Sequence, residues 1–147
     1  MKHFVVGVDV GGTNVKLGAV DVRAKVVARS SFSTQKFIQS PSRLITAISR
    51  AVVDLLQASG ISKKDVQGLG IGLPGLVDVK GGVVRFLPNI PGWRDVALRK
   101  ILENKLSLPV QVENDVNMIT LGEWQFGAGR GIKNLICMTL GTGVGAG

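Results

Sequence analysis

The residues best suited to chemistry form a short loop near the N-terminus, Asp9-Val10-Gly11-Gly12-Thr13-Asn14. Its two glycines allow backbone N–H groups to approach a phosphate with no Cβ in the way. Thr13 and Asn14 add side-chain donors, and Asp9 supplies a carboxylate of the kind that holds hydrated Mg²⁺ beside a phosphate. The loop therefore predicts a site for the phosphate tail of a nucleotide, with a plain hairpin turn as the alternative.

A second polar cluster, Glu113-Asn114-Asp115-Val116-Asn117, follows an apolar run that is typical of a strand. In open α/β sheets, ligands bind where strands end and helices begin. Asp115 has the chemistry to accept a proton from an alcohol, and Asn114 has an amide that can orient that alcohol. Asp and Asn in front of a helix are also common N-caps, so the cluster by itself indicates either a site or a cap.

Two glycine-rich segments are further candidates for phosphate binding. Gly70–Gly75 matches Gly-x-Gly-x-x-Gly, the pattern of dinucleotide-binding loops, which requires a helix directly after it. Pro74 lies inside this turn and a strand-like segment follows, so we reject the dinucleotide interpretation. Gly141-Thr142-Gly143 follows the apolar run 134–140 and is a better candidate, with an ordinary turn as the alternative.

The elements that must position these residues are predicted from hydrophobic periodicity and turn residues. Strands joined by short links predict an antiparallel meander at residues 3–10, 15–22 and 25–33. Ser40 and Pro41 predict the start of a helix whose apolar repeat continues to Gly60. Farther along, we expect a strand at 66–73, a hairpin at 76–88, an irregular loop at 88–93, a helix capped by Asp95 that runs to about Lys105, a strand at 109–113, a helix at 115–126 and a buried strand at 134–140.

This order of elements predicts a mixed α/β lobe joined to the start of a second lobe. The glycine-rich segment 127–131 has the composition of a hinge. We therefore expect one lobe over residues 1–128 and the beginning of another over residues 129–147.

The composition restricts the class of protein. The formal net charge is +8, from 18 Lys and Arg against 10 Asp and Glu, but the basic residues are scattered and Tyr is absent, which disfavours a nucleic-acid interface. Cys137 is the only cysteine and His3 the only histidine, so the sequence holds neither a disulfide framework nor a zinc-ligand cluster. We expect Cys137 to be a small core residue of its strand. No apolar run approaches ~18 residues, so no membrane span is expected and a cytoplasmic setting is the default.

Five motifs occur in one order along the chain: Gly7-Val8-Asp9-Val10-Gly11-Gly12-Thr13, Gly72-Leu73-Pro74-Gly75, Pro88-Asn89-Ile90-Pro91-Gly92-Trp93, Glu113-Asn114-Asp115-Val116-Asn117 and Leu140-Gly141-Thr142-Gly143-Val144-Gly145. Together they resemble the ROK family of sugar kinases and repressors, which belongs to the actin-like ATPase group. The resemblance extends over essentially all 147 residues, which correspond to about the first half of a typical member.

The resemblance implies two loops that bind the phosphates of a nucleotide. Asp9, Gly11, Gly12 and Thr13 match the first phosphate loop, and Asp9 lies near Mg²⁺ and contacts it through water. Gly141-Thr142-Gly143 matches the second phosphate loop, which belongs to the opposite lobe.

The resemblance also implies a sugar site. Asn114 and Asp115 match the sugar-binding pair, and Asp115 matches the catalytic base. Gly75 and the loop from Asn89 to Trp93 match the rim of the sugar pocket.

The fold implied by the resemblance is an α/β actin-like ATPase (ribonuclease H-like) N-terminal lobe with a mixed β-sheet, plus the start of a second similar lobe. The implied activity is ATP-dependent phosphorylation of a hexose with Mg²⁺, and glucose to glucose 6-phosphate is the favoured reaction. Family members place a zinc motif, further sugar contacts and the adenine pocket after the second phosphate loop. Zn²⁺ is therefore expected only in the complete family member, this chain alone is expected to be inactive, and a homodimer is compatible with the family likeness.

Two alternatives remain from other functional classes. One is a sugar-responsive repressor of the same family, which we disfavour because those members carry a helix-turn-helix domain ahead of the first loop. The other is a truncated, non-catalytic module that binds sugar without turnover.

Overall fold

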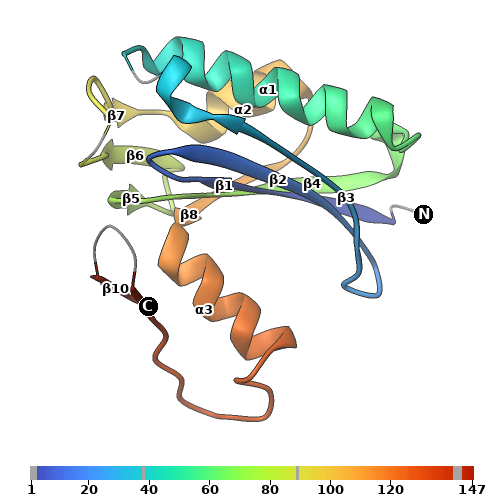
Figure 1. Ribbon diagram of the computed structural model, residues 1–147, viewed down its shortest axis with the longest axis vertical. Coiled ribbons are helices and arrows are strands. Elements are labelled where there is room, and N and C mark those ends of the chain that lie inside the picture. The colour runs from blue at the N-terminus through green and yellow to red at the C-terminus, as the bar shows by residue number, and fades with distance from the viewer. Residues whose placement is uncertain (1–2, 38, 89, 141–143) are drawn as a thin grey trace.

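The computed structural model describes residues 3–37, 39–88, 90–140 and 144–147. Its centre is a five-stranded mixed sheet with the order β3-β2-β1-β4-β8 (Figure 1). The strands β1, β2 and β3 pair antiparallel, whereas β4 runs parallel to β1, and β8 runs parallel to β4. These strands are β1 (Phe4–Val10), β2 (Asn14–Asp21), β3 (Val26–Ser33), β4 (Val66–Leu73) and β8 (Val110–Asn114), which confirms the predicted meander and the strands predicted at 66–73 and 109–113.

Alternation along β1 decides which face of the sheet is buried. Val6, Val8 and Val10 are buried, whereas Val5 and Asp9 are exposed. Because successive side chains of a strand point to opposite faces, the three valines pack into the core while Asp9 lies on the other face. The alternation therefore places the Asp9 carboxylate on the face of the sheet opposite the core.

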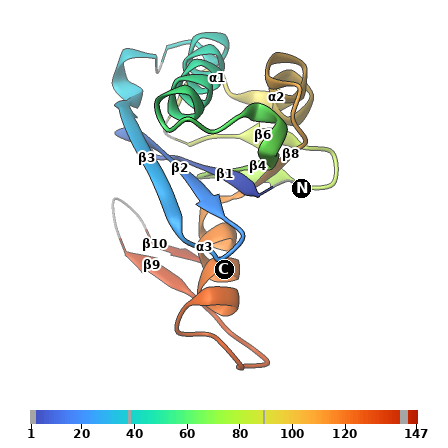
Figure 2. The same ribbon diagram turned by 90° about the vertical axis from the view of Figure 1, so that its right-hand side faces the viewer.

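Two helices, α1 (Pro41–Ala58) and α2 (Leu98–Leu106), cover the valine-bearing face (Figure 2). The helix α1 begins as predicted, because Ser40 Oγ accepts a hydrogen bond from the N–H of Arg43 and Pro41 occupies the first turn. It ends at Ala58, and Gly60 follows with a φ of 68°, as the sequence indicated. A short 3-10 turn, η2 (Lys63–Asp65), then leads into β4.

The predicted cap of α2 is wrong. Asp95 lies in the short strand β7 (Arg94–Val96), and Ala97 is the N-cap residue, with no side-chain hydrogen bond. Asp95 has a φ of 52°, and its Oδ1 accepts a hydrogen bond from Nη1 of Arg85 at 2.9 Å. The Asp95 carboxylate therefore forms a hydrogen bond between β6 and β7, whereas the local sequence predicts that it caps α2.

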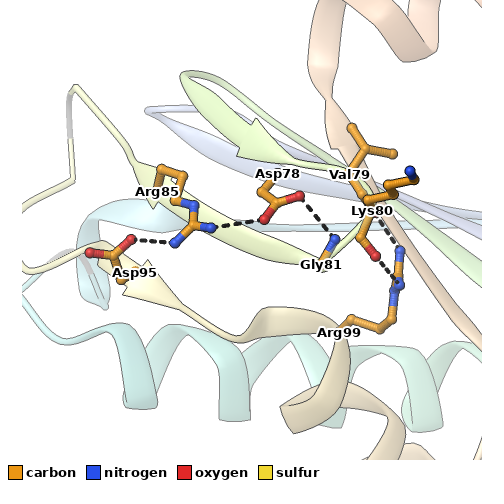
Figure 3. Close-up of polar contacts among 7 residues, drawn as sticks. All are labelled: Asp78, Val79, Lys80, Gly81, Arg85, Asp95 and Arg99. Atoms are coloured by element: carbon orange, nitrogen blue, oxygen red, sulfur yellow. Dashed lines mark hydrogen bonds and ion pairs between the residues drawn. The ribbon is translucent and has the colours of Figure 1, made fainter.

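A second, three-stranded sheet has the order β5-β6-β7 and contains the predicted hairpin, formed by β5 (Leu76–Asp78) and β6 (Val83–Phe86). Arg85 lies between Asp78 and Asp95, with a nitrogen–oxygen distance of 2.9 Å to each carboxylate (Figure 3). The N–H of Gly81 also donates to Asp78, and this bond together with Arg85 holds the pKa of the Asp78 carboxyl below its usual range. These contacts join all three strands of the small sheet.

Arg99 attaches the same hairpin to α2. Its guanidinium donates to the carbonyls of Val79 and Lys80 at 2.6 and 3.0 Å (Figure 3). A third bond, of 3.0 Å, reaches Oε1 of Gln111 on β8. The hairpin is therefore fixed both to the helix and to the central sheet.

The C-terminal region lies on the face of the sheet opposite to α1 and α2 (Figure 1). It contains α3 (Asp115–Phe126), as predicted, and an antiparallel pair, β9 (Met138–Leu140) and β10 (Val144–Ala146). Both views show β10 beside α3 (Figures 1 and 2).

The prediction of a buried strand over residues 134–140 is wrong. The strand β9 covers only three residues, and Met138 and Leu140 are 67% and 79% exposed. Cys137 precedes β9 and is half-buried, so it is not a core residue of a strand. An apolar run shows that a segment can be buried, but burial also needs a packing partner, and β9 pairs only with β10 among the described residues.

We predict that Ile48→Ala lowers the free energy of unfolding by about 2–5 kcal/mol, because the fully buried Ile48 fills the core between α1 and the sheet. Val53→Ala on the same helix is the matched control, because Val53 is 49% exposed. Its effect should stay within about 0.5 kcal/mol. Urea unfolding followed by circular dichroism measures both, and equal losses in the two variants would contradict this placement of α1.

Candidate functional site

Parallel pairing brings the predicted site residues to one edge of the sheet. Asp9 lies opposite Gly72 in the β1–β4 pair, and Gly72 lies opposite Glu113 in the β4–β8 pair. The three residues form one row across the strands, close to the carboxyl end of each strand. The first phosphate loop and the Glu113–Asn117 cluster therefore meet at this edge, although about a hundred residues separate them in the sequence.

The first phosphate loop is a tight connection between β1 and β2. The N–H of Gly11 donates to the carbonyl of Asn14 at 2.9 Å and closes the turn. Thr34, in the 3-10 turn η1 (Thr34–Lys36), contacts the loop through its hydroxyl, which donates to the carbonyl of Gly11 at 2.8 Å. Thr34 was not predicted from the sequence, because the only local signal is a polar residue at the end of a strand.

Asn114 is the N-cap residue of α3. Its Oδ1 accepts hydrogen bonds from the N–H groups of Val116 and Asn117 at 2.9 and 3.2 Å, so the capping alternative is correct for this residue. Its Nδ2 also donates to the carbonyl of Gly75 at 3.2 Å. The capping bonds therefore fix the orientation of the Asn114 amide, and its bond to Gly75 connects the start of α3 to the Gly75 turn.

Asp115 is the first residue of α3 and lies beside this cap. Its Oδ1 accepts from the N–H of Val116 at 2.9 Å. Glu113 supports the cluster from the strand side, because its Oε1 accepts from the N–H of Asn114 and from Nδ2 of Asn117 at 2.9 and 3.0 Å. Every polar residue of the predicted cluster thus takes part in one hydrogen-bonded group.

The Gly75 turn requires glycine. Gly75 has a φ of 103°, and a Cβ at this position would collide with the carbonyl oxygen of Phe86 and lie 3.0 Å from Cδ of Pro88. In the geometry that glycine allows, the Gly75 carbonyl accepts a hydrogen bond from Nδ2 of Asn114.

Gly72 allows α3 to pack closely against β4. A Cβ on Gly72 would lie 3.2 Å from Cα of Asp115 and 3.0 Å from Sδ of Met118. The absence of a side chain at Gly72 therefore sets how near Asp115 comes to the sheet.

Asp9 and Asp115 are electrostatically coupled. Partial burial raises the pKa of Asp9 above its usual 3.8, and the negative charge of Asp115 raises it further, while Lys16 opposes both effects. Lys16 lies directly opposite Asp9 in the β1–β2 pair. Lys16 was not predicted from the sequence as a neighbour of Asp9, although its position opposite Asp9 follows from the register of the hairpin. The Asp9 side chain remains exposed, so a cation in solution can reach it.

The carboxylates fit Mg²⁺ that arrives with a phosphate ligand. Among the described residues, no three His, Cys, Asp or Glu side chains gather in a way that could hold a metal ion by themselves. Mg²⁺ is usually held by one or two carboxylates together with substrate phosphates and water. Asp9 matches a magnesium site of this type, because it is exposed and its pKa is raised in part by the nearby charge of Asp115.

Some predicted site residues lie outside the described residues, namely Asn89 and the loop Gly141-Thr142-Gly143. The strand β10, which follows this loop, packs against α3, since a Cβ on Gly145 would lie 2.6 Å from Cγ2 of Val116. In the loop that follows Asn89, Ile90 and Trp93 are buried in the core, so they anchor the loop.

A large groove lies away from this edge of the sheet. It has a volume of about 930 Å³ and runs between β3 and α1, with Phe32, Lys36, Arg43 and Arg50 among its lining residues. Neither Asp9 nor Asp115 lines it. This groove is therefore separate from the row of Asp9, Gly72 and Glu113 at the sheet edge.

The comparisons with known proteins match this geometry. The model of the ROK family matches residues 5–147. The chain belongs to the ROK family. It is 43% identical to a glucokinase from Halalkalibacterium halodurans over 99% of this chain and 43% of that protein. It also superposes on the crystal structure of a ROK family glucokinase from Streptomyces griseus in complex with glucose and AMPPNP, with a TM-score of 0.86, 38% identity, and coverage of 97% of this chain and 43% of that one.

These matches confirm the expected fold class, an actin-like ATPase fold with a mixed sheet. A xylose repressor from Caldicellulosiruptor bescii is 28% identical over 97% of this chain and 35% of its own length. The chain spans less than half the length of these relatives. None of the helices in the described part of the chain combines the length and apolarity that a membrane crossing requires.

We predict that Gly72→Ala lowers the free energy of unfolding by about 1–3 kcal/mol, because the new methyl group pushes against the backbone of Asp115. Gly70→Ala in the same strand is the matched control, because a Cβ there meets nothing within 4 Å. Chemical unfolding measures both variants. A Gly72→Ala protein as stable as Gly70→Ala would contradict the close packing of α3 on β4.

The raised pKa of Asp9 predicts a dependence of stability on pH. The folded protein holds the Asp9 proton more tightly than the unfolded protein, so Asp9 opposes folding increasingly as the pH rises from 3.8 through the folded pKa. We therefore expect Asp9→Asn to raise Tm at neutral pH and to lose this gain at low pH.

Asp21→Asn is the control of opposite sign. The N–H groups of Lys25 and Arg23 hold the pKa of Asp21 below its usual value, so its charge favours folding at neutral pH. Thermal unfolding of both variants at neutral and acid pH makes the comparison. A lower Tm for Asp9→Asn at neutral pH would contradict the assigned environment of Asp9.

Proposed function

We propose that the protein containing this chain is an ATP-dependent sugar kinase that phosphorylates a hexose, with glucose to glucose 6-phosphate as the favoured reaction. The observation that carries the proposal is the meeting of a glycine-rich loop, Asp9 and the Asn114–Asp115 pair at one edge of the sheet. The named relatives support it, since they include glucokinases and a glucokinase bound to glucose and AMPPNP.

In this proposal, Asp115 is the general base. It accepts the proton of the attacking sugar hydroxyl while Asn114, fixed by its capping bonds, orients that hydroxyl. Asp115 occupies the first turn of α3, and the N-terminal end of a helix favours negative charge. The position therefore suits a carboxylate that must act in its ionised form.

The loop Gly11-Gly12-Thr13 binds the phosphate tail through the backbone N–H groups of Gly12 and Thr13 and through the Thr13 side chain, and Gly141-Thr142-Gly143 is the second loop. Asp9 holds hydrated Mg²⁺, which when bound neutralises charge on the phosphates. Gly75 and Asn89 form the rim of the sugar pocket. Catalysis then depends on bringing the hydroxyl and the terminal phosphate into line, because phosphoryl transfer needs little covalent help from the protein.

The division into a lobe at residues 1–128 and the start of a second lobe at 129–147 stays a prediction. Large apolar side chains from α3 onward support it, since Leu121, Phe126 and Ile136 are 55%, 66% and 81% exposed. Zn²⁺ in the complete protein, homodimer formation and a cytoplasmic location also stay predictions from the family likeness.

We predict that Asp115→Asn lowers kcat for sugar phosphorylation by about 100-fold or more, with the sugar Kd nearly unchanged, because the amide cannot accept the proton. The test uses the protein at its natural length, with a hexose panel scored by ADP release and sugar binding measured by calorimetry. Asp54→Asn is the control, because Asp54 forms an exposed ion pair with Arg50 on α1.

Each outcome has a clear meaning. Turnover by Asp115→Asn near that of Asp54→Asn would remove Asp115 from the base role. Sugar binding without ADP release in the unmodified protein would support a non-catalytic sugar-binding module. Sugar-dependent DNA binding at physiological salt would instead support the repressor function that the xylose repressor likeness suggests.

A further inference from the structure

The first phosphate loop is held from one side by the 3-10 turn η1. Thr34 is fully buried, with 0% of its surface exposed. Its hydroxyl donates to the carbonyl of Gly11 at 2.8 Å, and its N–H donates to the carbonyl of Thr13 at 2.9 Å. Gln35 completes the set, because its Nε2 donates to the carbonyl of Gly12 at 3.2 Å. The turn η1 therefore engages all three carbonyls of Gly11-Gly12-Thr13.

These bonds determine where the amide hydrogens of the loop point. In a trans peptide unit, the C=O of one residue and the N–H of the next point in opposite directions, and the described residues contain no cis peptide bonds. Since the carbonyls of Gly11 and Gly12 face η1, the N–H groups of Gly12 and Thr13 face away from it. Neither N–H has a hydrogen-bond partner within the part of the chain that the structure describes.

A glycine pair needs such a restraint. Glycine reaches positive φ as readily as negative φ, so a Gly-Gly peptide unit can turn over at little conformational cost. A turned unit would present a carbonyl oxygen, which repels a phosphate, in place of an N–H, which binds one. The hydroxyl of Thr34 is buried against Gly11 and favours the orientation with the N–H outward.

We propose that Thr34 and Gln35 are positioning residues of the nucleotide site, which hold the loop carbonyls back and aim the N–H groups of Gly12 and Thr13 at a phosphate. Neither residue touches the phosphate itself. The inference rests on the proposed function for the role of the loop, and it adds the residues that set the loop's orientation.

The test compares Thr34→Val, which keeps the shape but removes the hydroxyl, with Thr34→Ser, which restores it. In the protein at its natural length, we expect Thr34→Val to raise KM for MgATP about tenfold, with KM for the sugar unchanged. Thr34→Ser should return KM for MgATP to within about twofold of the original value. Gln35→Ala removes one exposed bond and should give a smaller rise, and it serves if Thr34→Val fails to fold.

Ser49→Ala is the matched control for buried hydroxyl loss. Ser49 is 8% exposed, and its hydroxyl donates to the carbonyl of Ile45 at 2.8 Å inside α1, away from the loop. It should lower stability without changing KM for MgATP. Loss of nucleotide affinity in Ser49→Ala equal to that in Thr34→Val would show a general stability effect and overturn the positioning role.

A binding measurement separates this inference from the proposed function. On addition of MgADP, we expect the amide resonances of Gly12 and Thr13 to shift in the unmodified protein and in Thr34→Ser, with a weaker Kd in Thr34→Val. This result with no sugar phosphorylated would contradict the kinase proposal and support the positioning role. Equal MgADP affinity in Thr34→Val and the unmodified protein would overturn the positioning role alone, and no MgADP binding at all would overturn both.

Discussion

The structure depends on the parallel pairing of β1 with β4 and of β4 with β8. Parallel strands in one sheet end at the same edge, so this pairing brings Asp9, Gly72 and Glu113 into one row. It also fixes where α3 starts, because α3 begins at Asp115, directly after Asn114, the last residue of β8. The helices α1 and α2 contribute to this pairing, since they are part of the long connections that parallel strands require.

Close approach at this edge is made possible by residues without side chains. Gly72 lets Asp115 lie against β4, and Gly75 adopts a positive φ that delivers its carbonyl to Asn114. Partly buried hydrogen bonds then restrict these glycine-containing segments, through the capping amide of Asn114 on one side and the hydroxyl of Thr34 on the other. The edge therefore combines backbone freedom with side chains that restrict it to one arrangement.

The same arrangement places the carboxylates of Asp9 and Asp115 close enough for their negative charges to repel each other. Desolvation and the charge of Asp115 raise the pKa of Asp9, and Lys16 opposes both effects. Under the proposed function, Mg²⁺ held by Asp9 would supply compensating positive charge, so this cost would be lower when the ligand is bound. The opposite situation is seen at Asp78, because the N–H of Gly81 and the guanidinium of Arg85 both donate to its carboxylate and lower its pKa.

Local apolar periods and turn residues were sufficient to predict the meander, α1, β4, the hairpin of β5 and β6, and α3. The sequence also indicated two candidate site segments, the glycine-rich loop at Asp9–Asn14 between two strands and the polar Glu113–Asn117 cluster in front of α3, because their residue types are chemically distinctive. Three-dimensional pairing, in contrast, shows that Asp95 contacts Arg85 and does not cap α2, and that β9 is short and exposed. Those outcomes, like the contact of Thr34 with the first phosphate loop, depend on which residues meet across distant parts of the chain, and no local pattern carries that information.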